Sequence, residues 1–268
     1  MSDYQKELDL LIDATRAAGP IAMKFFEGEV KSWDKGDDDP VSEADHAVND
    51  ILRDVLRPAR PDYGWLSEED PDDLNRLDRA RVWMIDPIDG TRSFLKKTPE
   101  FTICAGLVEN GRPIAGVVYN PAKNELFEAT LGGGARLNGV AISVNHEAEM
   151  ETARFLAARQ IFDRAGWRNA PKRANFAYVN SIAYRMMMVA CGRHDACVSL
   201  AEKCDWDIAA AELIVLEAGG KVTTSKHEGF DYNKPVPRHR SLIIAPNALH
   251  REVMDFLDQV ERPAGKTW

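Results

Sequence analysis

The sequence lacks long apolar stretches and has few cysteines. These two features argue against a membrane protein and against a secreted protein held together by disulfides. No apolar run reaches the ~18 residues that suggest a membrane-spanning helix, and the first residues are polar where a secretory signal would be apolar. The four cysteines form no C-x-x-C pair. Without a signal peptide ahead of them, we expect reduced thiols in a cytoplasmic protein.

Positive charge is also scarce. The chain has 34 lysines and arginines against 43 acidic residues, for a formal net charge of −9. A nucleic-acid surface needs a basic stripe, so we expect no nucleic-acid partner. Glycines 132–134 are not followed by the Lys-Ser/Thr of a phosphate-binding P-loop, which favours a structural turn. The remaining composition is ordinary for a globular protein, and 268 residues suffice for one large domain or two lobes sharing a core.

Hydrophobic spacing predicts an α+β chain. Helices are predicted at residues 4–27, 41–56, 180–190, 208–218 and 249–260. Strands are predicted at residues 30–33, 63–67, 82–85, 101–108, 113–119, 125–130, 153–162, 196–200, 222–224 and 241–245. We expect a mobile loop at residues 34–40 and a solvent-exposed insert at 71–80. This order indicates an N-terminal lobe with a large antiparallel sheet over residues 1–150 and an α/β lobe over 151–268, together forming one compact unit.

The turn at residues 86–91, Asp-Pro-Ile-Asp-Gly-Thr, follows a predicted buried strand. Pro87 has no N–H to donate, so we expect the strand to end there. Asp86 and Asp89 lie within one turn of each other, and two carboxylates this close repel unless a cation lies between them. Because hard oxygen ligands suit magnesium, the turn indicates a magnesium site. A capped helix with two solvated acids is the alternative.

Three further acidic residues have a similar local context. Glu68 follows a predicted strand, and Asp207 begins the most strongly helical segment of the chain. Asp45 lies three residues after Ser42 in a capping-box pattern. Asp45 and Asp207 could serve only as helix caps, which is the structural alternative for each. Together with the 86–91 turn, Glu68 and Asp207 form the set expected for two or three divalent ions.

Several blocks of sequence resemble one protein family. They are Glu68-Glu69 after a strand, the 86–91 turn, and Trp206-Asp207 followed by an alanine-rich helix that ends at Gly219-Gly220. In this order they resemble the inositol monophosphatase superfamily of magnesium-dependent, lithium-sensitive phosphatases, and residues 41–45 resemble a fourth block. The similarity spans nearly the whole chain. It implies a layered α/β/α/β/α sandwich of the inositol monophosphatase and fructose-1,6-bisphosphatase type, usually as a homodimer.

The resemblance also implies a set of magnesium ligands. Carried over position by position, the first ion would be held by Glu68, Asp86 and the backbone carbonyl of Ile88. The second would be held by Asp86, Asp89 and Asp207, with Glu68 also near a weaker third ion. Two ions bridging a phosphate stabilise both the attacking and the leaving oxygen.

The same resemblance implies how water would attack the phosphate. Thr91, polarised by Asp45 and helped by Glu68, would orient and deprotonate the water. Backbone N–H groups of Gly90 and Thr91 would cradle the phosphate. Lys35 is the lysine of the 34–40 loop that we expect nearest to the site. No covalent phosphoenzyme is needed.

Substrate choice is less clearly encoded. Inositol-specific members have an acidic residue before the Trp-Asp block, whereas this chain has Ser199 there. Residues 203–207 look closer to the bacterial branch of 3′(2′),5′-bisphosphate nucleotidases, which act on 3′-phosphoadenosine 5′-phosphate. Arg92 belongs to an Arg-Ser-Phe segment that also occurs in relatives cleaving histidinol phosphate. We expect Arg92 to bind substrate, and Asn180, Ser181 and Ser199 to lie on the leaving-group side.

Two functional hypotheses of different classes follow. The first is a phosphoric monoester hydrolase acting on an inositol-1-phosphate-type ester or on 3′-phosphoadenosine 5′-phosphate, with histidinol phosphate as the alternative substrate. The second is a non-catalytic regulator that keeps the fold and binds a partner. The complete set of carboxylates and the presence of Thr91 favour the first.

Overall fold

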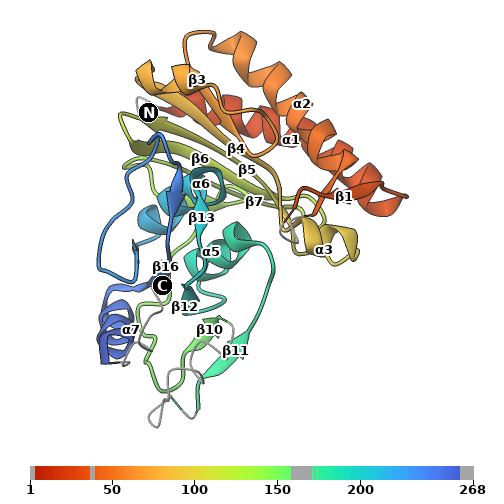
Figure 1. The fold of residues 1–268 in the computed structure, drawn as a ribbon. Coiled ribbons are helices and arrows are strands. Elements are labelled where there is room, and N and C mark those ends of the chain that lie inside the picture. Colours follow the sequence, from red (N-terminus) through yellow and green to blue (C-terminus); the bar gives the residue numbers. More distant parts are fainter. Residues whose placement is uncertain (1–3, 37–39, 158–170, 172, 260–268) are drawn as a thin grey trace.

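Two β-sheets form the framework of the computed structural model, which describes residues 4–36, 40–157, 171 and 173–259 (Figure 1). The large sheet has the strand order β3-β4-β5-β6-β7-β8-β9. Its strands are β3 (Gly64–Ser67), β4 (Arg81–Asp89), β5 (Thr102–Glu109), β6 (Arg112–Asn120), β7 (Glu125–Thr130), β8 (Ala135–Leu137) and β9 (Val140–Ala141). The small sheet has the order β11-β10-β12-β16-β14. Its strands are β10 (Arg154–Leu156), β11 (Asn175–Ala177), β12 (Ala196–Ser199), β14 (Gly220–Thr223) and β16 (Leu242–Pro246).

Helices separate and cover the sheets in five layers (Figure 1). Helices α1 (Gln5–Glu27) and α2 (Glu43–Ala59) pack on one face of the large sheet, and α5 (Ile182–Ala190) and α6 (Asp205–Glu217) pack on the other. The small sheet lies beyond α5 and α6, and α7 (Asn247–Gln259) packs on β14 and β16. The predicted α+β class and layered sandwich are confirmed. The division into lobes at residue 150 stays a prediction.

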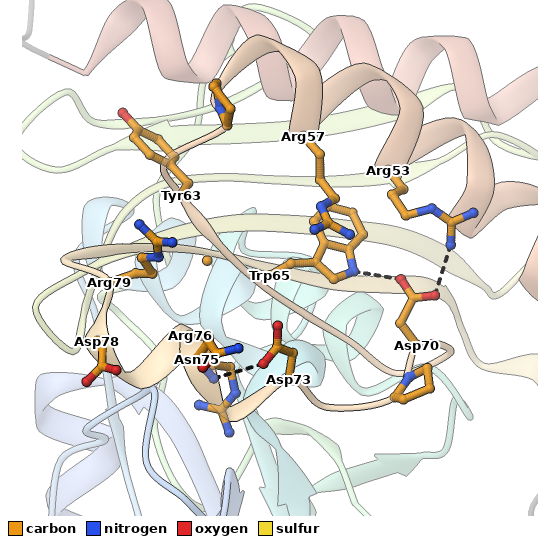
Figure 2. Close-up of a pocket in the computed structure, with 13 residues that line it drawn as sticks. Arg53, Arg57, Tyr63, Trp65, Asp70, Asp73, Asn75, Arg76, Asp78 and Arg79 are labelled. Atoms are coloured by element: carbon orange, nitrogen blue, oxygen red, sulfur yellow. Dashed lines mark hydrogen bonds and ion pairs between the residues drawn. The ribbon is translucent and has the colours of Figure 1, made fainter.

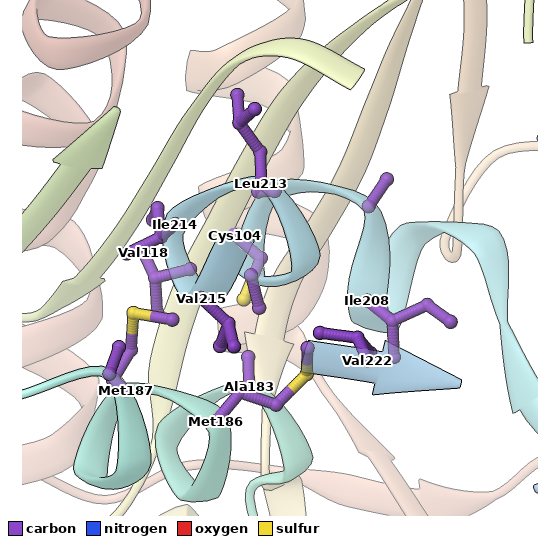
Figure 3. Packing of buried hydrophobic residues seen from close by; sticks show 14 of the residues in the cluster. Cys104, Val118, Ala183, Met186, Met187, Ile208, Leu213, Ile214, Val215 and Val222 are labelled. Carbon is purple, nitrogen blue, oxygen red and sulfur yellow. The ribbon is translucent and has the colours of Figure 1, made fainter. Parts of the chain in front are cut away.

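Helix α6 lies at the centre of these layers, and most of its side chains are buried. It packs against β4 to β7 of the large sheet, against α5 and against β14. Figure 3 shows Ile208 and Val215 of α6 among Met186, Met187 and Val222. A helix covered on most of its surface has little need of a polar stripe, which explains why its sequence shows no clear amphipathic pattern.

Two glycines of the large sheet allow α6 to approach closely. A Cβ on Gly116 would lie 2.9 Å from Ala210 Cα, and one on Gly106 would lie 3.2 Å from the Ala210 backbone nitrogen. Glycine on the strands and alanine on the helix therefore bring the two backbones together. This contact sets the depth of α6 and, with it, the position of Asp207.

Strand β4 does not end at Pro87, contrary to the prediction. It continues to Asp89, and its register with β5 shifts so that Asp86 pairs with Cys104 and Asp89 with Thr102. The bulge takes Pro87 out of the regular ladder, so its missing N–H breaks no pairing. Asp86 and Asp89 are thereby held on one rigid strand instead of a free turn.

The segment predicted as a solvent-exposed insert is partly buried. It contains the 3₁₀ helix η1 (Leu74–Asp78), whose Arg76 is only 2% exposed. Arg76 donates to both carboxylate oxygens of Asp72 and to Asn233 Oδ1. A charged residue in a polar segment indicated a surface position, but these partners satisfy the guanidinium inside the protein.

Smaller differences concern short elements. Helix α2 extends through Pro58 to Ala59, beyond its predicted end. The large sheet is antiparallel except for the parallel pair β3–β4. Residues 37–39 of the predicted mobile loop and residues 158–162 of the strand predicted at 153–162 lie outside the described residues. The helix α3 (Thr91–Leu95) begins at Thr91, as the turn indicated.

Elements not predicted are β2 (Pro40–Ser42), which pairs with β1 (Ser32–Asp34), the pair β13 (Lys203–Cys204) and β15 (Arg238–His239), and the strand β11. Within the described residues, no helix is both long and apolar enough to cross a membrane.

Candidate functional site

Three carboxylates from separate elements meet at one point. One ligand oxygen from each of Glu68, Asp86 and Asp207 lies within 4.8 Å of the others. Strands β3 and β4 run parallel with Ser67 beside Ile85, so the residues that follow, Glu68 and Asp86, project from the same edge. Asp207 comes from the first turn of α6. The structure therefore brings together three acids that were predicted as metal ligands.

The carboxylates of the cluster are at least partly buried and repel one another. Burial raises the pKa of Asp86 well above its usual range, and the nearby charges of Glu68, Asp89 and Asp207 add to the rise. Burial also raises the pKa of Glu68 to about 8, against the opposing charge of Lys35. The Lys35 ammonium lies 3.1 Å from Glu68 Oε1 and 2.7 Å from Glu69 Oε1, so this lysine reaches the site. Such a group of buried oxygens favours a further hard cation.

Asp89 joins the site to helix α5. Its Oδ2 accepts hydrogen bonds from Ser181 Oγ and the Ala183 N–H, both at 2.6 Å, and its Oδ1 accepts one from the Ile182 N–H at 3.2 Å. Burial raises the pKa of Asp89, whereas these hydrogen bonds and the charge of Arg185 oppose the rise. Asp89 therefore binds the N-terminus of a helix that lies far along the chain. The sequence prediction missed this structural role, because nothing near Asp89 indicates which helix its carboxylate meets.

Thr91 connects the 86–91 turn to helix α2. Its Oγ1 lies 3.2 Å from Asp45 Oδ1 and 3.1 Å from the Ile88 carbonyl. The other Asp45 oxygen accepts hydrogen bonds from the Ser42 N–H at 2.9 Å and the Ser42 hydroxyl at 2.6 Å. Burial raises the pKa of Asp45 to about 6. Asp45 thus caps α2 with one oxygen and faces Thr91 with the other, so the two alternatives for this residue are compatible.

Gly90 permits the sharp exit from β4. Its φ is +96°, and a Cβ there would lie 3.0 Å from the Glu100 carbonyl and from Ser181 Cβ. Both the left-handed backbone and the lack of space require glycine. The N–H groups that the resemblance assigns to phosphate binding are therefore positioned by a turn that no other residue fits without strain.

A cavity of about 810 Å³ opens beside the carboxylate cluster. The predicted site residues that line it are Glu68, Asp86, Ile88, Asp89, Gly90, Thr91, Arg92, Asn180, Ser199 and Asp207. Ser181, which we predicted on the leaving-group side, is fully buried and does not line the cavity. Asp45 lies behind Thr91. The lining also includes residues to which the sequence analysis gave no site role, among them Tyr178, Arg185, Glu202 and Lys203.

A second cavity, of about 660 Å³, lies between α2 and the segment around η1 (Figure 2). Here Asp70 is already paired, because it accepts hydrogen bonds from Arg53 at 2.9 Å and from the Trp65 indole N–H at 2.7 Å. Asp73 caps η1 by accepting from the Asn75 N–H at 3.0 Å. Since these acids have their own partners and do not converge, the first cavity is the better candidate for chemistry.

Comparison with known proteins identifies relatives along nearly the whole chain. A model of the inositol monophosphatase family matches residues 3–260. The Nus factor SuhB of Haemophilus influenzae is 32% identical over 266 residues, which cover 92% of this chain and 94% of the relative. The inositol-1-monophosphatase of Rhizobium meliloti is 33% identical, over 83% of this chain and 86% of the relative.

Solved structures give the same picture. An inositol monophosphatase (IMPase) from Thermotoga maritima superposes with a TM-score of 0.83 at 31% identity, covering 95% of this chain and 98% of that one. The extragenic suppressor protein suhB from Bartonella henselae superposes with a TM-score of 0.84 at 27% identity, covering 95% of this chain and 99% of that one.

Proposed function

The chain belongs to the inositol monophosphatase family, and on that premise we propose that it is a magnesium-dependent phosphatase that hydrolyses a small phosphate monoester. The observation that carries the proposal is the convergence of Glu68, Asp86 and Asp207 beside a cavity of about 810 Å³. This cavity is large enough for a sugar phosphate or a nucleotide. Thr91 lines the same cavity.

The acidic cluster fits magnesium on the chemistry of its donors. All its side-chain donors are carboxylate oxygens, and burial together with mutual repulsion raises the pKa values of Glu68 and Asp86. Glu68, Asp86 and Asp207 would hold the ion, and we propose Asp89 and the Ile88 carbonyl as further ligands. Bound magnesium supplies Lewis-acid polarisation of the phosphate and lowers the pKa of water.

The remaining steps belong to residues of the chain. With Asp45 ionised, the Thr91 hydroxyl donates to Asp45 Oδ1 and leaves its lone pairs free to accept a hydrogen bond from the attacking water. A pKa of about 6 keeps Asp45 mostly ionised at neutral pH, so it can act as this acceptor. We propose that the N–H groups of Gly90 and Thr91 bind the phosphate oxygens and that Glu68 helps to deprotonate the water.

A non-catalytic regulatory role is the second candidate, because relatives at 32% identity are named Nus factors. The catalytic proposal is favoured by the geometry of Thr91 and Asp45, since a protein that only binds a partner has no need of a hydroxyl held beside a buried carboxylate. The homodimer, the lithium sensitivity and the cytoplasmic location stay predictions.

A phosphate-release assay tests the proposal. The purified protein is given magnesium and, in turn, inositol-1-phosphate, 3′-phosphoadenosine 5′-phosphate, histidinol phosphate and fructose-1,6-bisphosphate. We expect release from at least one ester, abolished by EDTA and lowered about 100-fold or more in Asp86→Asn and Asp207→Asn. Asp73→Asn, in the second cavity, is the control and should keep full activity. Full activity in Asp86→Asn, or no release from any ester by a protein that captures a stable partner, would overturn the proposal.

A further inference from the structure

The cavity beside the carboxylate cluster is lined by charges of both signs. Its acids include Glu68, Asp86 and Asp207 of the carboxylate cluster. The cations Arg185 and Lys203 line the same cavity, and so does Glu202, whose carboxylate pairs with Arg238. In a chain with a net charge of −9, two cations beside an acidic cluster need a reason.

Arg185 is held rigidly beside this cavity. Its side chain is buried with only 6% exposed, and its Nε and Nη2 donate to the carbonyls of Val179 and Asn180, the latter at 3.2 Å. Its guanidinium carbon lies 4.4 Å from the centre of the Tyr178 ring. Within the described part of the chain, no carboxylate lies within ion-pair distance of this guanidinium. Carbonyls and a ring fix its orientation without a direct ion pair, although the guanidinium lies close enough to Asp89 for its charge to oppose the rise in the pKa of Asp89.

Lys203 is similar in its partners. Its ammonium donates to the backbone carbonyls of Ala201 and Glu202, at 3.3 Å and 2.9 Å. The Glu202 carboxylate instead pairs with Arg238 at 2.7 Å. The acid nearest to Lys203 in sequence is therefore engaged elsewhere, and the lysine charge faces the cavity.

The two cations reach one cavity from different elements. Arg185 comes from α5, and Lys203 comes from β13, shortly after Ser199 of β12, and both line the cavity. The charges of both also oppose the effect of burial, which raises the pKa of the Cys197 thiol in β12 to about 11. Two cations that line one cavity are suited to recognise a phosphate or carboxylate group.

We propose that Arg185 and Lys203 bind a second anionic group on the alcohol part of the substrate. The enzyme then selects phosphate monoesters that carry a further phosphate or carboxylate. A neutral polyol would leave both cations without a partner, and an alcohol with a positive amine would be repelled. This inference rests on the proposed phosphatase function and chooses among the substrates that the sequence left open.

Two esters that differ only in the second charge provide the test. The rate constant kcat/KM is measured with magnesium for 3′-phosphoadenosine 5′-phosphate and for adenosine 3′-monophosphate, which lacks the 5′-phosphate. We expect the doubly charged ester to be preferred about 10- to 100-fold, as charge-assisted hydrogen bonds predict. In Lys203→Gln the ratio should fall about 10-fold, chiefly through KM, and raising the salt concentration should lower it in the wild type.

Control variants separate binding from folding. Arg185→Gln should lower the ratio further, and Arg185→Lys, which keeps the charge, should restore part of it. Lys221→Gln, at an exposed position of β14, should leave the ratio unchanged. Equal kcat/KM for both esters in the wild type, or an unchanged ratio in Lys203→Gln, would overturn the inference while leaving the phosphatase proposal intact. Absence of magnesium-dependent release from either ester and from p-nitrophenyl phosphate would overturn both.

Discussion

At the scale of single residues, the Thr91 hydroxyl has one proton and two acceptors, Asp45 Oδ1 at 3.2 Å and the Ile88 carbonyl at 3.1 Å. Only one can be engaged at a time. If a magnesium ion takes the Ile88 carbonyl, as the resemblance implies, the proton turns to Asp45. The choice of acceptor would then orient the hydroxyl for water.

Replacing Thr91 by valine keeps its shape and removes this hydroxyl. We expect kcat to fall about 100-fold or more, because a positioned proton acceptor contributes that much, while the melting temperature changes little. Thr91→Ser should retain most of the activity. The control is Thr98→Val, whose hydroxyl donates to the Ser93 carbonyl outside the cavity. A Thr91→Val variant as active as the wild type would remove Thr91 from the mechanism.

His250 predicts how stability depends on pH. Its ring is 2% exposed, Nε2 lies 3.0 Å from Thr223 Oγ1, and burial lowers its pKa to about 4. Between pH ~6.5 and that value the unfolded chain binds a proton that the folded protein excludes. The free energy of unfolding should therefore decrease as the pH is lowered through this window, by about 2 kcal/mol from pH 7 to pH 5.

Urea denaturation at both pH values measures this effect. His250→Gln, which keeps a hydrogen-bonding group near Thr223 but does not titrate, should lose about 2 kcal/mol less than the wild type between pH 7 and pH 5. The control is His46→Gln, on the exposed face of α2. Identical losses in His250→Gln and the wild type would show that His250 does not contribute.

At the scale of elements, a chain of hydrogen bonds connects η1 to the first turn of α6. Arg76 of η1 holds Asn233, whose N–H donates to Asp205 Oδ2 at 2.8 Å in the first turn of α6. His239 Nε2 lies 2.8 Å from the other oxygen of Asp205. This chain of contacts connects the segment between β3 and β4 to the turn that carries Asp207.

Replacing Arg76 by methionine should lower the free energy of unfolding by about 1–3 kcal/mol, because it leaves the Asn233 amide oxygen without its buried donor, whereas Asp72, whose side chain is 32% exposed, can be solvated. Urea denaturation measures the change. Arg238→Met is the control, since its pair with Glu202 is about half exposed on both sides and should contribute less than about 1 kcal/mol. A loss in Arg76→Met no larger than in the control would mean that the buried contacts are not stabilising.

Local patterns in the sequence predicted these elements only where the elements are themselves local. The capping box at Ser42 was predicted because its chemistry lies within three residues. The continuation of β4 through Pro87 depends on the register of β5, which adjacent residues do not encode. Arg185 was missed because it lies in a helix that is otherwise apolar, and its partners Val179 and Asn180 are carbonyls that any sequence has.

At the scale of the whole molecule, the layers meet at α6. Its apolar sides were visible in the sequence, but its partners on β5, β6 and α5 were not, since these contacts join distant segments. The close approach at Gly116 transmits any displacement of the large sheet to α6. The position of Asp207 is therefore a property of the layered packing.

Adding one methyl group at this contact tests that dependence. Gly116→Ala should lower the free energy of unfolding by about 1–3 kcal/mol through overpacking, and the magnesium concentration for half-maximal activity should rise roughly 10-fold as Asp207 moves. Gly229→Ala is the control, because its new Cβ would have no neighbour within 4 Å. If Gly116→Ala is destabilised but its magnesium dependence is unchanged, the contact between α6 and the large sheet does not determine the position of Asp207.

The three clustered carboxylates lie far apart along the chain, and this separation has a consequence for biosynthesis. Glu68 and Asp86 leave the ribosome early, whereas Asp207 becomes available only when α6 can dock against the large sheet. A nascent chain that ends before residue 205 therefore contains the edge of the sheet but not the complete ion cage. If the protein is the phosphatase proposed above, it acquires activity only late in translation, and a truncated product of premature termination would be inactive.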